Sequence, residues 1–91
     1  MPKLPNGIKF YKAKYPKKYL AVMPSGKRVS FGHQGYQQYK DTVPKNLGGG
    51  KWSHKNHLDK ERRRKYRKRH SAQGYHKRLY SPAWFSYYFL W

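Results

Sequence analysis

Ten consecutive residues, Lys60 to Arg69 (KERRRKYRKR), include eight Lys or Arg side chains and constrain this chain more than any other stretch. A polypeptide cannot bury so many like charges in its own core, because each unpaired buried cation costs several kcal/mol or more. The chain as a whole has a formal charge of +19 at pH 7. Such an imbalance predicts an anionic partner, most often nucleic acid and less often an acidic protein surface or an anionic membrane. The residues predicted to contact a polyanion are Lys60, Arg62, Arg63, Arg64, Lys65, Arg67, Lys68 and Arg69.

Residues 58–70 carry the local signals of a helix. Asp59 can cap the first turn or lie in it, Glu61 follows near the positive end of the helix dipole, and nothing breaks the run before Gly74. On a helical wheel one face gathers two apolar residues and three cations, which are Leu58, Arg62, Lys65, Tyr66 and Arg69. We therefore expect the helix to dock through its two apolar side chains and the methylene stems of the cations.

The composition predicts an ordered fold of one small domain. High charge and low overall hydropathy are typical of disorder, but 19% of the 91 residues are aromatic and supply apolar surface for a core. Cysteine is absent, which excludes disulfides and thiolate zinc sites.

The clearest local element is a β-hairpin at residues 18–32. Two short β-type runs, KYLAVM and RVSFG, flank Pro24-Ser25-Gly26-Lys27, which has the residues of a tight turn. Two strands alone are unstable in water, so the hairpin needs a cover from the chain or from another subunit.

The sequence as a whole predicts an α+β fold. This fold is a small single domain with a β-hairpin, two or three short helices, an extended basic N-terminal arm and an aromatic C-terminal helix. The predicted boundaries are an arm at 1–17 and a domain at 18–91, divided into hairpin 18–32, short helix 33–41, Gly-rich loop 44–57, basic helix 58–70 and aromatic segment 81–91. In the loop, Gly48-Gly49-Gly50 predicts either a flexible joint or a place where the backbone passes close to another chain, with a phosphate cradle as a weaker alternative.

The aromatic segment begins with Ser81-Pro82, a capping residue followed by a proline suited to the first helical position. Residues 83–91 are apolar on nearly every side but too few to span a bilayer. The segment either completes an intramolecular core or inserts into a groove on a partner protein. The predicted interface anchors are Trp52, Trp84, Phe85, Tyr88, Phe89 and Trp91.

Catalysis is disfavoured by the residue inventory. With three acidic residues, paired-carboxylate acid/base chemistry has almost no candidates. His54 and His57 have a metal-like spacing, but structural zinc sites nearly always include cysteine. We expect a non-enzymatic protein with no cofactor, no metal site and no small-molecule substrate; a metal-dependent nuclease using these two histidines is the remaining alternative.

Several short motifs stand out in this sequence. They are Phe31-Gly32, Tyr36, Tyr39-Lys40-Asp41, Pro44, Gly48-Gly49-Gly50-Lys51-Trp52, His54-Lys55-Asn56-His57, Asp59, Arg62-Arg63, Tyr66-Arg67, Arg69-His70-Ser71, Tyr80-Ser81-Pro82-Ala83-Trp84-Phe85 and Phe89-Leu90-Trp91. Together they resemble a family of small basic proteins of nucleocytoplasmic large DNA viruses, among them the chlorella viruses and their relatives, and the similarity extends over about residues 18–91. The resemblance implies a viral setting and no particular activity.

In that setting the leading interpretation is a virion structural protein, a minor capsid or capsid-associated component on the inner face of the capsid. The arm and the aromatic segment would contact capsid proteins, and the basic helix would meet acidic surfaces or packaged DNA. During assembly the protein would be in the host nucleus or cytoplasm. The alternative is a sequence-independent DNA-binding or condensing protein of the viral nucleoid, because no base-reading motif is present and cations alone bind phosphates.

Overall fold

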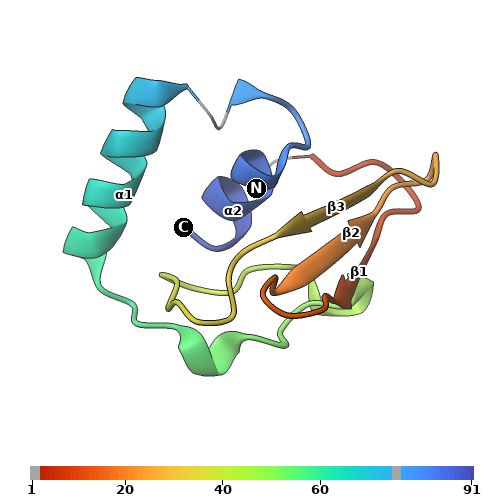
Figure 1. Ribbon diagram of the computed structural model, residues 1–91, viewed down its shortest axis with the longest axis horizontal. Coiled ribbons are helices and arrows are strands. Elements are labelled where there is room, and N and C mark those ends of the chain that lie inside the picture. Colours follow the sequence, from red (N-terminus) through yellow and green to blue (C-terminus); the bar gives the residue numbers. More distant parts are fainter. Residues whose placement is uncertain (1–2, 75–76) are drawn as a thin grey trace.

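Three short strands form an antiparallel sheet in the computed structural model of this chain, which describes residues 3–74 and 77–91 (Figure 1). They are β1 (Lys9–Lys12), β2 (Tyr19–Val22) and β3 (Arg28–Phe31), arranged in chain order with β2 in the centre. The hairpin predicted at residues 18–32 is confirmed by the pairing of β2 with β3. Its turn closes with the Met23 amide donating to the Lys27 carbonyl at 2.8 Å.

The prediction of an arm outside the domain, at residues 1–17, is wrong for its central part; residues 1 and 2 lie outside the described residues. β1 pairs with β2 along its length, and Ile8 and Phe10 are buried in the core. The prolines of this segment flank the strand and so leave its backbone free to pair. β1 therefore supplies the third strand that the hairpin needs for stability.

The helix α2 (Pro82–Phe89) covers one face of the sheet and lies between the helix α1 (Lys60–Gln73) and the sheet in Figure 1. The Ser81 hydroxyl accepts from the Trp84 amide at 3.1 Å, which confirms the predicted cap. Inside the core, the Phe85 ring stacks on Phe31 with centroids 5.1 Å apart, and Phe10 meets Phe85 edge-on at 5.9 Å.

Four of the six predicted interface anchors belong to this core. Trp52, Trp84, Phe85 and Phe89 are buried, and the Trp52 indole donates to the Lys18 carbonyl at 2.9 Å. They are not available to a partner in this fold, because each of them is buried in the protein's own core. Tyr88 and Trp91 are half-buried and pack against the same core.

The short helix predicted at residues 33–41 is also wrong. The backbone of this stretch bonds to distant segments: the Gln38 amide donates to the Lys55 carbonyl at 3.2 Å, and the Lys40 amide donates to the Leu90 carbonyl at 3.1 Å. Gln38 pairs with Asn56 in an isolated β-bridge. The segment after it contains two 3-10 turns, η1 (Lys45–Leu47) and η2 (Ser53–Lys55).

A buried carboxylate fastens this irregular region to the sheet. The Asp41 carboxylate accepts a hydrogen bond from the Tyr19 hydroxyl. It also accepts hydrogen bonds from the backbone amides of Val43 at 3.1 Å and Trp52 at 3.0 Å. Burial and the bond to Asp41 raise the pKa of Tyr19 above its ordinary value, so this hydroxyl stays a donor. The connection positions the segment that follows β3 beside the basic helix.

Candidate polyanion-binding site

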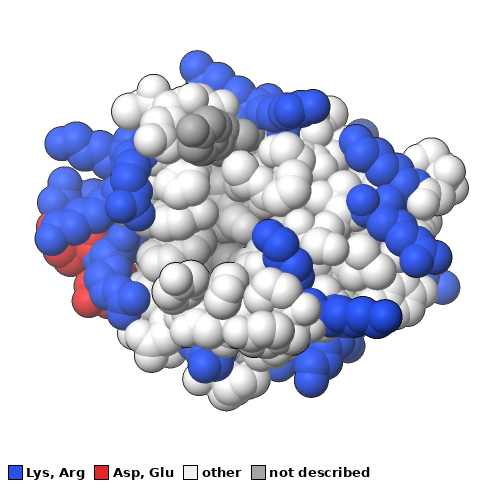
Figure 2. All heavy atoms as spheres, viewed as in Figure 1, with Lys and Arg blue, Asp and Glu red and all other residues white. Residues whose placement is uncertain are grey.

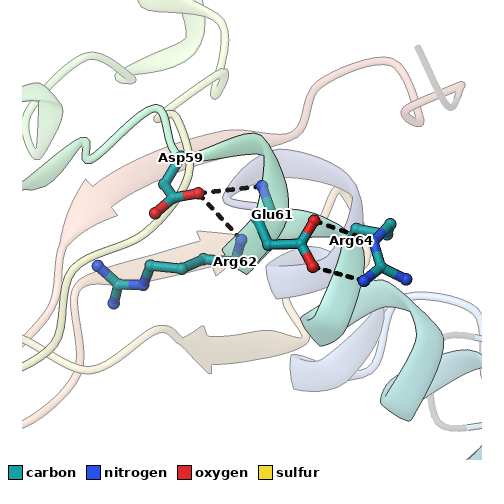
Figure 3. A network of polar contacts seen from close by, with 4 residues as sticks. All are labelled: Asp59, Glu61, Arg62 and Arg64. Atoms are coloured by element: carbon teal, nitrogen blue, oxygen red, sulfur yellow. Dashed lines mark hydrogen bonds and ion pairs between the residues drawn. The ribbon is translucent and has the colours of Figure 1, made fainter.

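The basic run forms a helix, α1 (Lys60–Gln73), and its termination signals act as predicted. Asp59 caps the N-terminus by accepting from the amides of Glu61 at 3.0 Å and Arg62 at 3.2 Å (Figure 3). Gly74, in the left-handed conformation with φ 73°, ends the helix. The helix begins and ends two to three residues later than predicted.

The face of α1 that meets the rest of the protein differs from the predicted one. Four half-buried residues face inward, and they are Arg63, Tyr66, Arg67 and His70. The Tyr66 ring lies between Trp91, at a centroid distance of 4.2 Å and an angle of 7°, and His70 at 3.9 Å. Leu58 lies before the helix with φ 55° and remains 57% exposed, so it takes no part in docking. The contact is made by stacked rings instead of aliphatic side chains.

Two of the predicted polyanion-binding residues hold this contact together. Arg63 and Arg67 donate from Nε to the Trp91 carbonyl oxygen at 2.8 and 3.0 Å. Their guanidinium carbons lie 4.6 Å from the ring centroids of Tyr39 and Tyr87, respectively. Arg63 and Arg67 therefore help to dock α1, and their predicted contact with a polyanion stays a prediction.

The other six predicted cations point away from the core and are exposed, and they are Lys60, Arg62, Arg64, Lys65, Lys68 and Arg69. Within residues 3–74 and 77–91 the one ion pair between side chains joins Arg64 to Glu61 (Figure 3). The hydrogen bond and the charge of Arg64 hold the pKa of Glu61 below its usual range. The remaining cations have no acidic partner in the described part of the chain, so α1 presents uncompensated positive charge.

A cavity of about 640 Å³ opens beside this charged helix, between α1 and the sheet. Five cations line it, and they are Lys17, Lys18, Arg62, Lys65 and Arg69. Four aromatic residues line it, and they are Phe31, Tyr36, Tyr66 and Trp91. Figure 2 shows the hollow with Lys and Arg side chains along α1 at its left, and the visible acidic atoms at the outer edge of that helix. None of the residues recorded at the cavity wall is acidic, so its field is positive.

Most of the residues that line the cavity were not predicted from the sequence, and Lys18 is the most deeply buried of its cations. Lys18 is 1% exposed, and its amine donates to the Gln38 side-chain oxygen in a short hydrogen bond. Burial, and secondly the charge of Lys55, lowers the pKa of the Lys18 amine to about 8, against the opposing effect of Asp41. Lys18 directly precedes β2, and both Lys18 and Tyr19 are buried, so the alternation of a strand gives no signal for it.

The low pKa of Lys18 predicts an unusual dependence of stability on pH. From pH 8 to 10.5 the unfolded chain keeps a proton that the folded protein has released, so the free energy of unfolding increases with pH. The expected contribution is about 3 kcal/mol over this window. Urea unfolding of wild type and Lys18→Met, measured at several pH values, should give a difference that grows in this direction.

Lys17→Met is the matched control, because Lys17 is the exposed neighbour of Lys18. It should retain the wild-type pH dependence. The tyrosines are present in all three proteins, so their contribution cancels in the comparison. Parallel pH profiles for wild type and Lys18→Met would contradict a buried amine with a lowered pKa.

The histidine pair does not form a metal centre of the usual kind. His57 uses Nδ1 to accept from the Asp59 amide at 2.9 Å, and burial, followed by the charge of Arg62, lowers its pKa. Across the described ranges no three His, Cys, Asp or Glu side chains are grouped to hold a metal ion. Likewise, neither helix in these ranges is long and apolar enough to cross a membrane.

Fold and site together define a small α+β protein with a basic helix and an aromatic, positively charged cavity. Family models, curated proteins and solved structures were compared with the chain, and none matches it. The function is therefore inferred from the residues and their geometry.

Proposed function

We propose that this protein binds nucleic acid through the phosphate backbone, without reading base sequence. The observation that carries the proposal is the cavity-side face of α1, where Arg62, Lys65 and Arg69 lie together with no acidic partner in the described residues. Side chains on one helix face, three and four residues apart, are neighbours, so these cations suit the repeated charges of a phosphate backbone. We further propose that the protein is not an enzyme.

The capsid-associated role stays a prediction that depends on the resemblance. Its two expected contact segments were the arm and the aromatic segment, but β1 and α2 use most of their apolar side chains in the protein's own core. The exposed cations of α1 do not pack in the protein's core. They favour a polyanion, and nucleic acid is the commonest polyanion for so basic a chain.

Removal of charge from α1 tests the proposal. We expect Arg62, Lys65, Lys68 and Arg69, all changed to Gln, to reduce the slope of log affinity against log salt by up to about 3 to 4 for duplex DNA, since each phosphate contact contributes roughly 0.9. Glutamine is a good helix former, so α1 should remain folded. Fluorescence anisotropy with unrelated duplexes between low and physiological salt gives the slope.

The control removes the same number of charges elsewhere, by changing Lys9, Lys14, Lys27 and Arg28 to Gln. These residues are exposed on the strands and turns and do not line the cavity. The control should lose less of the salt slope than the α1 variant. Equal losses would mean a diffuse charge effect, and absence of duplex and single-strand binding at low salt would refute the proposed function.

A further inference from the structure

Two exposed tyrosine rings lie near the positively charged cavity, one of them in its wall and the other close to a residue of that wall. Tyr36 lines the cavity and is 68% exposed, and Tyr15 is 77% exposed. His33, another cavity residue, lies between them, with ring centroids 4.6 Å from Tyr36 and 6.4 Å from Tyr15. Large apolar ring faces left in water are available to a ligand.

Hydrogen bonds hold these rings in an ordered frame. The Gln34 amide donates to the Pro16 carbonyl at 2.8 Å, and the Gln34 side chain donates to the Lys17 carbonyl at 2.7 Å. The two loops that bear the tyrosines are therefore fastened together. Arg62 donates to the Gln37 side-chain oxygen at 3.0 Å, which connects the same frame to α1.

The other cavity aromatics are less accessible. Both faces of Tyr66 are covered, by Trp91 and by His70. Phe31 is fully buried beneath the cavity. The rim, and above all Tyr36, is therefore where an incoming ring can stack.

We propose that the cavity and its tyrosine rim bind single-stranded nucleic acid. An unpaired base stacks on Tyr36, a neighbouring base stacks on Tyr15, and Arg62, Lys65 and Arg69 hold the adjoining phosphates. This combination of a cationic groove and exposed rings is how proteins bind single strands without sequence preference. In a duplex the base faces are already stacked on one another and cannot reach the rim. The inference depends on the proposed function and specifies its ligand.

The test compares binding of a pyrimidine single strand, an abasic strand of equal length and a duplex at one salt concentration. Tyr36→Ala should weaken binding of the single strand about 5- to 100-fold, because it removes the stacking of one base. Binding of the abasic strand and the duplex should be unchanged, since they offer phosphates but no free base face.

Two further variants separate stacking from other effects. Tyr36→Phe keeps the ring without the hydroxyl and should bind the single strand as wild type does. Tyr11→Ala removes a tyrosine that is 48% exposed on β1 and does not line the cavity, so it should also bind normally. Circular dichroism of each variant verifies that the fold is retained.

The outcomes distinguish this inference from the proposed function. If Tyr36→Ala weakens the abasic strand as much as the natural one, or leaves the natural strand unaffected, the stacking site is refuted while phosphate binding stands. A nucleoside monophosphate could compete as effectively as the oligonucleotide at equal concentration of nucleotide units. This result would show that the site binds a free nucleotide and would refute a single strand as its ligand. If no strand binds at low salt, both proposals fail.

Discussion

Phe85→Ala should destabilise the protein by about 3 to 5 kcal/mol, a large part of the stability of a domain this small. Phe85 is fully buried, stacked on Phe31 and met edge-on by Phe10, so alanine would leave a cavity at the contact between α2 and the sheet. Thermal or urea unfolding of the isolated protein measures the loss. A loss at the upper end of this range should leave the folded state barely populated at room temperature.

Leu79→Ala is the control, because Leu79 is large and apolar but exposed. Its stability should lie within about 0.5 kcal/mol of wild type. The pair of variants also decides between the two interpretations of the aromatic segment. Wild-type stability in Phe85→Ala would contradict an intramolecular core and return this side chain to a partner interface.

Gly48→Ala should be at least as damaging, with a loss of about 4 kcal/mol or more. A Cβ at this position would lie 1.9 Å from the Phe10 carbonyl oxygen, which belongs to the backbone of β1. Backbone on both sides cannot move aside as a flexible side chain does, so the loop after η1 would have to separate from the sheet. Urea unfolding of the variant, compared with wild type, measures the loss.

Gly26→Ala provides the matched comparison. Gly26 has φ +91° and Gly48 has φ +109°, but a Cβ at Gly26 would meet no atom within 4 Å. Its expected loss is therefore only the conformational penalty of about 1 to 2 kcal/mol. Similar losses in the two variants would show that the close approach to Phe10 is unimportant. The sequence predicted that the glycine triplet passes close to another chain, whereas Gly48 makes its close approach to the protein's own β1.

Local signals were sufficient for three elements of the fold. The turn at Pro24-Ser25-Gly26-Lys27, the caps of α1 and the Ser81-Pro82 start of α2 each depend on residues next to one another in sequence. The α+β class followed from them. Residues 33–41 were mispredicted because their backbone partners, such as Lys55 and Leu90, are distant in sequence. β1 was missed because the prolines on either side of it were taken as a sign that residues 1–17 form an extended arm without regular structure.

The sequence predicted the cations of α1, but it only partly predicted which of them face the rest of the protein and which face solvent. Tyr66 is the one aromatic residue of the basic run, and taking it as the centre of the docking face would have placed Arg63 and His70 inward with it, since they lie three and four residues away. The cavity had no such signal. Lys18, Tyr36 and Arg62 come from three separate segments and meet only through tertiary contacts.

The parallel stack of Tyr66 on Trp91 also determines how closely α1 approaches Trp91, which follows α2 and lines the cavity. The two ring faces are in van der Waals contact and cannot move closer together. The hydrogen bonds of Arg63 and Arg67 to the Trp91 carbonyl keep α1 from moving away from Trp91. The gap beside α1 is therefore held at fixed width before any ligand arrives. Preorganisation of this kind reduces the ordering entropy lost on association, and a small, strongly charged protein can thereby gain affinity without a larger interface.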